Sequence, residues 1–261
     1  MLDNVSIIYN TCDKYESLWP GFFTLFKKYW KDCSNTIILN TEEKTFHMDG
    51  LQIVRPDKSG TACSWSQRLI NSLDIVTTPY VVMILDDFYL KSPVNLEKLE
   101  RCVNRMELDK SIQLFTFAWQ PGSNKTDTED PDFERRARFA PYRINAQIAL
   151  WRVDYLRKII RSYENPWQFE ISGSFRSSIY GGKLYALKKE APLVFDYDWG
   201  FLIIRGKVNE KVADYFKHHE GLPMDLPFEK FTQNDDQTKR NGRIGRLIKY
   251  GSEMMVSLFR K

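Results

Sequence analysis

An unbroken apolar run that ends in two adjacent carboxylates is the feature that most constrains the fold of this chain. Residues 80–85 read Tyr-Val-Val-Met-Ile-Leu, follow a proline, and lead directly into Asp86 and Asp87. A run of this length without polar alternation is typical of a strand buried on both faces of an α/β sheet. Ligands bind beyond the carboxyl ends of such strands, so the sequence predicts a binding site at these two acids. The alternative is that Asp86 caps the following turn and Asp87 is solvated.

Segments with strand and helix patterns alternate on both sides of this run. Helices are expected over residues 15–31, 64–73, 94–106, 153–163 and 211–218. Strands are expected over residues 5–12, 36–39, 51–54, 80–85, 112–119, 146–151, 183–187 and 193–204. This order predicts an α/β fold with a mostly parallel central sheet and helices on both faces. The polar segment 120–143 interrupts the pattern and is expected to be a long loop that closes over a ligand.

Composition excludes several classes of protein. With 261 residues and 43% hydrophobic content, the chain can bury a sizeable core and is not intrinsically disordered. The four cysteines are scattered without zinc-ligand spacing, so we expect free thiols in a reducing compartment. Neither a signal peptide nor an apolar stretch of membrane-spanning length is visible, so a cytoplasmic location is expected.

The last residues, 238–261, form a basic amphipathic tail. Between positions 239 and 261 seven basic residues stand against one acid, Glu253. Apolar side chains share one helical face there, namely Ile244, Leu247, Ile248, Met254, Met255 and Leu258. The tail suits an anionic membrane surface, with the protein peripheral at the inner face of the cell membrane, or it docks on its own domain. Because the basic residues gather in one tail without a reading motif, nucleic acid is not expected as a partner.

The acid pair suits a nucleotide-diphosphate site. A Mn²⁺ or Mg²⁺ ion held by Asp87 and Asp86 would neutralise a diphosphate and stabilise it as a leaving group. Arg68, on the preceding helix, could add a fixed positive charge, or it could be an ordinary solvated residue. Trp119 ends a predicted strand and is expected to face the same crevice and contact the donor sugar or acceptor, with burial in the core as the alternative.

The stretch from Ser64-Trp65-Ser66-Gln67-Arg68 to Leu85-Asp86-Asp87-Phe88 resembles the central segment of GT-A-fold glycosyltransferases of the bacterial surface-polysaccharide type, which build lipopolysaccharide or capsule. In that family a helix with an Arg-Asn-like pair leads into a strand that ends in an Asp-x-Asp metal motif, of which Asp-Asp-Phe is a variant. The resemblance covers roughly residues 4–205. It implies that the nucleotide-sugar is held by Asn10, Thr11, Asn40, Arg68, Asp86 and Asp87.

Two departures from the family pattern affect the expected site. Phe88 stands where the third-position acid is usual, so a metal would rest on Asp87 together with a ligand from elsewhere, such as His218 or His219. The second strand ends in Asn40-Thr41, where many members carry an acid pair for the base.

The resemblance also implies a single catalytic domain, 1–237, with a nucleotide-sugar half at 1–119 and an acceptor half at 144–237. An inverting transfer needs a general base that faces the anomeric carbon. Glu170 is expected to be this base, because neighbouring aromatic residues would raise the pKa of its carboxylate, and Trp167 can stack on a sugar. Asp196 and Asp198 are the next candidates, and Glu170 could instead be an ordinary charged loop residue.

These features predict an inverting glycosyltransferase that passes a sugar from a nucleotide-diphosphate donor to a lipid-linked glycan for surface-polysaccharide synthesis. One alternative is a sugar-nucleotide nucleotidyltransferase, although such enzymes need a glycine-rich phosphate loop and residues 10–14 contain no glycine. The other is a non-catalytic, membrane-associated binding protein.

Overall fold

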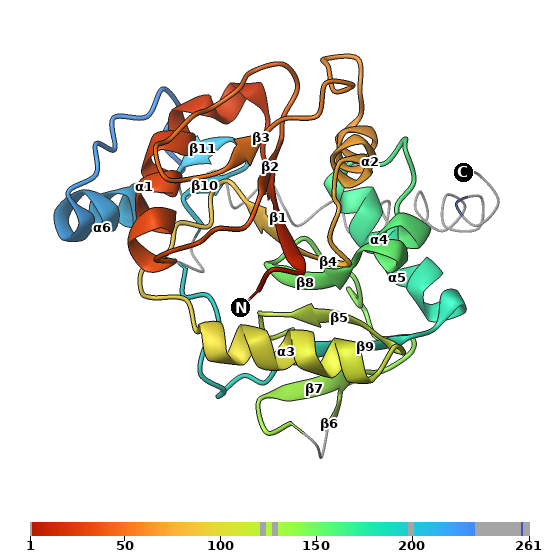
Figure 1. The fold of residues 1–261 in the computed structure, drawn as a ribbon. Helices are drawn as coiled ribbons and strands as arrows, with labels where there is room; N and C mark the ends of the chain where they lie inside the picture. The colour runs from red at the N-terminus through yellow and green to blue at the C-terminus, as the bar shows by residue number, and fades with distance from the viewer. Residues whose placement is uncertain (1, 121–123, 127–129, 198–200, 233–256, 258–261) are drawn as a thin grey trace.

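A nine-stranded sheet forms the centre of the protein. The computed structural model describes residues 2–120, 124–126, 130–197, 201–232 and 257. The strand order is β3-β2-β1-β4-β8-β5-β9-β7-β6 (Figure 1). The strands are β1 (Val5–Asn10), β2 (Ile37–Asn40), β3 (Ile53–Val54), β4 (Tyr80–Leu85), β5 (Ile112–Thr116), β6 (Asn124–Thr126), β7 (Phe133–Arg136), β8 (Ala149–Arg152) and β9 (Lys183–Leu187).

The sheet is mostly parallel, as predicted. Strands β3, β2, β1 and β4 pair in parallel, and so do β5 and β9. Strand β8 lies antiparallel between β4 and β5, and β7 lies antiparallel between β9 and β6. The carboxyl ends of β1, β2 and β4 therefore meet at one edge, together with the amino end of β8.

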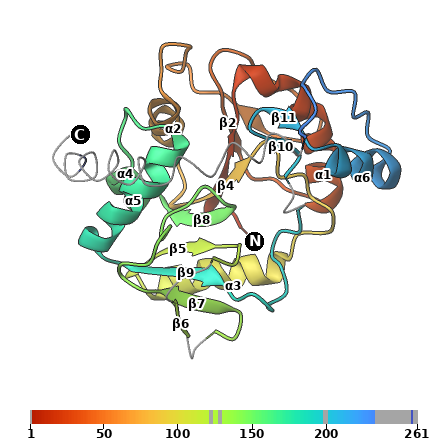
Figure 2. The same ribbon diagram turned by 180° about the vertical axis from the view of Figure 1, so that it is seen from behind.

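Helices cover both faces of the sheet (Figures 1 and 2). Side chains alternate along each strand, so Ile7 and Val82 enter one core while Ile8 and Met83 enter the other. The first core is closed by α1 (Trp19–Tyr29), α3 (Leu96–Leu108) and α6 (Glu210–Glu220). The second is closed by α2 (Trp65–Asp74), α4 (Val153–Ile159) and α5 (Pro166–Tyr180). The predicted α/β class is confirmed.

Three local predictions were wrong. Segment 120–143 is not one long loop, because β6 and β7 extend the sheet and Phe133 packs edge-on against Phe115 with ring centroids 5.0 Å apart. The strand expected over 193–204 is reduced to β10 (Ile203–Ile204), which pairs with β11 (Lys207–Val208) in a separate hairpin. Its apolar pattern reflects core packing instead, since Phe195 and Tyr197 are buried.

The third correction concerns the region of Glu170, which is a helix and not a loop. Asn165 and Gln168 form a reciprocal capping box at the start of α5, and Pro166 occupies its first turn. Two helix predictions also changed in their bounds: 15–31 divides into a 3₁₀ segment, η1 (Asp13–Leu18), and α1, and the helix expected over 153–163 ends at Ile159.

The basic tail predicted over 238–261 lies outside the described residues, except for Ser257. Among the helices of the described part of the chain, none has the length and apolar character needed to cross a membrane.

Candidate functional site

The acid pair lies at the carboxyl edge of the sheet, where the fold brings three strands together. Asn10 is paired in register with Leu85 of β4 on one side and with Asn40 of β2 on the other. Asp86 follows at once and is 9% exposed, and Asp87 is half-buried. The predicted nucleotide-binding residues at the ends of β1, β2 and β4 are therefore neighbours in space.

Thr11 links the end of β1 to the acid pair. Its hydroxyl donates a 2.6 Å hydrogen bond to Asp86 Oδ2 and accepts one of 2.8 Å from the indole nitrogen of Trp19. All three side chains are buried, so the hydrogen bond from Thr11, itself held by Trp19, fixes the orientation of the Asp86 carboxylate.

Asn10 and Asn40 form a second polar pair at this edge. Asn40 Nδ2 donates a 2.8 Å hydrogen bond to Asn10 Oδ1. Asn40 is fully buried, yet its Oδ1 has no hydrogen-bond partner among the described residues. A buried acceptor without a partner is costly to the folded state.

Arg68 lies near the start of α2, where Ser64 caps the helix by accepting a 2.9 Å hydrogen bond from the Gln67 amide. Arg68 is buried, and its Nη1 is 2.9 Å from Glu42 Oε1. Its Nε has no partner among the described residues. The solvated-residue interpretation of Arg68 is therefore wrong.

Glu42 is a residue that the sequence analysis missed. Besides pairing with Arg68, it accepts a 2.6 Å hydrogen bond from the Asp13 amide through Oε2, which ties the loop after β2 to the segment after β1. Many members of the family that this chain resembles carry an acid pair directly at the end of the second strand, where this chain has Asn40-Thr41. Glu42 stands one residue further along, and that offset was visible in the sequence.

Burial perturbs both carboxylates of the acid pair. Desolvation raises the pKa of Asp86 to about 7, against the lowering effect of the Thr11 hydrogen bond. Desolvation, and then the charge of Asp86, raise the pKa of Asp87 well above its ordinary value. Among the described residues no Lys, Arg or His forms an ion pair with either acid. Two buried oxygen ligands without a balancing cation fit a divalent ion whose remaining ligands are phosphate oxygens and water.

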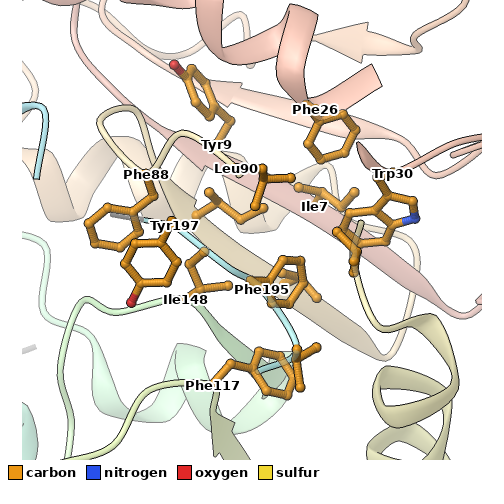
Figure 3. Close-up of a cluster of buried hydrophobic side chains, with 14 of the residues drawn as sticks. Ile7, Tyr9, Phe26, Trp30, Phe88, Leu90, Phe117, Ile148, Phe195 and Tyr197 are labelled. Atoms are coloured by element: carbon orange, nitrogen blue, oxygen red, sulfur yellow. The ribbon is translucent and has the colours of Figure 1, made fainter. Parts of the chain in front are cut away.

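Phe88, in the third position of the motif, belongs to the core. It is 2% exposed and stacks on Tyr197 with ring centroids 4.5 Å apart and an interplanar angle of 17° (Figure 3). Tyr197 in turn donates a 2.7 Å hydrogen bond to Gln147 Oε1, just before β8. The side chain at this position therefore points away from any ligand, and an acid there would be buried among aromatic rings.

The histidines considered as additional metal ligands are elsewhere. His218 and His219 are exposed in the last turn of α6, next to Glu220. Glu220 binds Lys28 and Tyr29 in the last turn of α1. Because α1 starts after the carboxyl end of β1 and runs back, its last turn lies at the opposite edge of the sheet, so these histidines cannot reach Asp87. Within the described ranges no cluster of three or more His, Cys, Asp or Glu side chains could hold a metal ion.

Glu170 lies at the same edge as the acid pair. Met83 of β4 is in register with Ala149 of antiparallel β8, so the residues that follow β4 and those that precede β8 share the carboxyl edge. Glu170 Oε1 accepts a 2.8 Å hydrogen bond from the amide of Ala146, three residues before β8. Burial raises the pKa of Glu170, and the hydrogen bond from Ala146 opposes that rise.

The two tryptophans predicted to contact sugar are on the surface. Trp167, one turn before Glu170 in α5, is 68% exposed. Trp119, which follows β5, is 39% exposed, so the alternative of a core tryptophan is wrong, and Lys189 Nζ lies 5.9 Å from its ring centroid. Of the other candidate bases, Asp196 is half-buried and its carbonyl accepts from the Lys91 amide, while Asp198 lies outside the described residues.

Comparison with known proteins shows what fold this is. No protein-family model and no curated protein sequence matches the chain. Among solved structures, S. aureus TarS 1-349 superposes with a TM-score of 0.51 at 9% identity, covering 73% of this chain and 59% of that one. The fold is of the GT-A type. A longer TarS structure gives 0.51 at 9% identity, over 82% of this chain and 40% of the other, and TarS 1-349 in complex with UDP gives 0.50 at 9% identity, over 73% and 59%.

This likeness concerns the GT-A fold alone. The chain spans about 59% of the shorter TarS structures and 40% of the longer one.

Proposed function

We propose that this protein is a glycosyltransferase that transfers a sugar from a nucleoside-diphosphate donor to a glycan acceptor. The observation that carries the proposal is the acid pair, buried Asp86 and half-buried Asp87, which stands without a balancing cation among the described residues at the end of β4 in a GT-A sheet. TarS, which has a similar fold, was solved with UDP bound.

The donor is assigned to the half formed by residues 1–119. Asn10 and Asn40, hydrogen-bonded to each other at the ends of β1 and β2, would meet the nucleoside. Arg68 would supply positive charge towards the diphosphate, and Glu42 would hold its guanidinium in place. A Mn²⁺ or Mg²⁺ ion on Asp86 and Asp87 would offset the charge that develops on the departing diphosphate.

The acceptor is assigned to the half formed by residues 144–237, with Glu170 as general base. Glu170 would remove the proton from the acceptor hydroxyl while that oxygen bonds to the anomeric carbon of the donor sugar. The bond from this carbon to the diphosphate oxygen breaks on the opposite face, which inverts the configuration. The raised pKa of Glu170 suits this role, because a base with a higher pKa accepts a proton more readily.

Trp119 would contact a sugar. It presents exposed indole surface, and aromatic rings pack well on the apolar face of a pyranose. A lipid-linked acceptor in surface-polysaccharide synthesis is the finer form of the proposal, supported by the basic tail 238–261.

A thermal-shift panel tests the proposal. Nucleoside diphosphates and their sugar conjugates, each with Mn²⁺, with Mg²⁺ and without metal, are expected to raise the melting temperature for one nucleotide class, most strongly with metal. Asp87→Asn should remove the metal-dependent part of the shift, whereas Asp3→Asn, an exposed acid before β1, should not. No shift with any nucleotide would refute a nucleotide-sugar site. A shift with nucleoside triphosphates alone would favour the nucleotidyltransferase alternative.

A further inference from the structure

Helix α5 has its amphipathic pattern reversed. Apart from Phe169, its inward face carries small and polar residues, while other large apolar side chains face outward at a spacing of four. Trp167 and Ile179, at the two ends of this outward stripe, are 68% and 43% exposed, and Ile171 and Phe175 between them are half-buried. We call these four residues the α5 stripe. Surface helices normally present polar residues to water, so a stripe of this kind indicates a binding surface.

Close packing explains the small residues on the inward face. A side chain at Gly173 would place its Cβ 3.3 Å from Ile159 Cγ2 of α4 and 3.5 Å from Ile144 Cγ2. Ser174 Oγ accepts a 2.9 Å hydrogen bond from the Ile144 amide, which holds the chain before β8 along the helix. A larger side chain is therefore excluded at Gly173, but nothing in this packing requires large apolar residues on the outward face.

The charged residues of α5 are also turned inward. Arg176 is fully buried and forms a bidentate pair with Glu164, with Nη–Oε distances of 2.7 and 2.6 Å. Glu170 binds the Ala146 amide. The outward face of the helix is left without a charge of its own, in a chain that is 28% charged.

Basic residues lie around the carboxyl-terminal end of the α5 stripe. Lys158, exposed on α4, places Nζ 4.8 Å from the ring centroid of Tyr180. Arg138, also exposed, donates a 2.7 Å hydrogen bond to the Ser178 carbonyl. Arg161 donates hydrogen bonds to the Tyr180 hydroxyl at 2.9 Å and to the Ser257 carbonyl at 3.2 Å, so Ser257 lies beside the end of α5.

We infer that the α5 stripe docks on an anionic lipid bilayer. An uncharged apolar surface that includes a tryptophan and is flanked by cations matches the boundary between acyl chains and negatively charged headgroups. The apolar side chains enter the interface, and Lys158 and Arg138 lie at the level of the headgroups. This role needs only the surface itself and holds whether or not the acid pair binds a nucleotide-sugar.

Vesicle flotation with the full-length protein tests the inference. The wild-type chain is expected to bind vesicles of phosphatidylglycerol and phosphatidylcholine, and to bind pure phosphatidylcholine far less. Ile171→Gln combined with Phe175→Gln should reduce binding to anionic vesicles at least about tenfold, because two apolar side chains lose their favourable transfer. The matched control is Leu108→Gln, an apolar residue that is 89% exposed on α3 and lies on the other face of the sheet. It should bind as the wild type does.

Three results would overturn the inference. The first is a wild-type chain that does not bind anionic vesicles. The second is a double variant that binds as well as Leu108→Gln does. The third is a wild-type dimer, seen by light scattering, that the double variant dissolves, since a second copy would then be the occupant of the stripe. Trp167→Gln gives an independent reading, because a residue so exposed can be changed without unfolding the helix, and it too should weaken vesicle binding.

Discussion

The Thr11 hydroxyl donates a 2.6 Å hydrogen bond to Asp86 Oδ2 while it accepts a 2.8 Å hydrogen bond from the Trp19 indole. One hydroxyl thereby satisfies a buried donor and orients a buried carboxylate. Thr11 is therefore held between Trp19 and Asp86. We expect it to fix the orientation of the acid pair as well as to border the nucleotide.

Thr11→Val keeps the shape of the side chain and removes its hydroxyl. The Trp19 indole and Asp86 each lose a partner inside the protein, so the free energy of unfolding should fall by about 1–3 kcal/mol. Stabilisation by Mn²⁺ should weaken as well, since Asp86 is no longer held. Thr11→Ser, which retains the hydroxyl, is the control for both readouts in urea denaturation. Equal behaviour of the two variants would mean that the hydrogen bonds do not matter.

The raised pKa of Asp86 predicts that the stability of the protein depends on pH. Its pKa is raised by burial from 3.8 to about 7, so between these values the native state holds a proton that the unfolded state has lost. The contribution of Asp86 to the free energy of unfolding should therefore be present below about pH 4 and fall as the pH rises towards 7. Asp86→Asn lacks this titration, so its stability relative to the wild type should increase across that window without metal. Urea denaturation of the wild type and of Asp86→Asn at pH 5 and pH 8 measures the effect, with Asp3→Asn as the control. If the two proteins differ in free energy of unfolding by the same amount at both pH values, the prediction is contradicted.

Glu170→Gln separates donor binding from transfer. The amide oxygen of glutamine can still accept the hydrogen bond from Ala146, so the fold and the nucleotide-dependent thermal shift should persist. Turnover should fall by about 10²–10⁴, the usual contribution of a general base. Turnover is measured as the nucleoside diphosphate that is released when sugar is transferred to a glycan acceptor. Undiminished turnover would move the role to Asp196 or Asp198.

Phe88→Asp would complete the family's Asp-x-Asp motif in sequence, yet it should not create a metal ligand. The side chain lies in a buried stack with Tyr197, and a carboxylate there would be desolvated without a partner. The free energy of unfolding should fall by at least about 3 kcal/mol through lost packing and the buried charge. Calorimetry with and without Mn²⁺ checks both points, and Phe88→Leu should cost much less. Stronger Mn²⁺ binding in Phe88→Asp would show that the stack can open.

Local sequence patterns were enough to locate most of the fold. The apolar run 80–85 forms β4 with the predicted bounds, and 183–187 forms β9, because buried strands need continuous apolar side chains. Ser64 caps its helix as its side chain predicts. Since the ligand edge of an α/β sheet follows from strand direction, the position of Asp86 and Asp87 could be predicted from the sequence as well.

The tertiary structure decided which side chains are available there. Phe88, two residues beyond the strand, turns into the core because Tyr197, more than a hundred residues away in sequence, stacks on it. Glu42 becomes part of the site because the folded chain brings Arg68 of α2 next to it. Gly173 stands on the inward face of α5 because Ile144 and Ile159 pack closely against it. Periodicity and charge are properties of a local segment and can be predicted from it, whereas partners distant in sequence determine the direction and burial of a side chain.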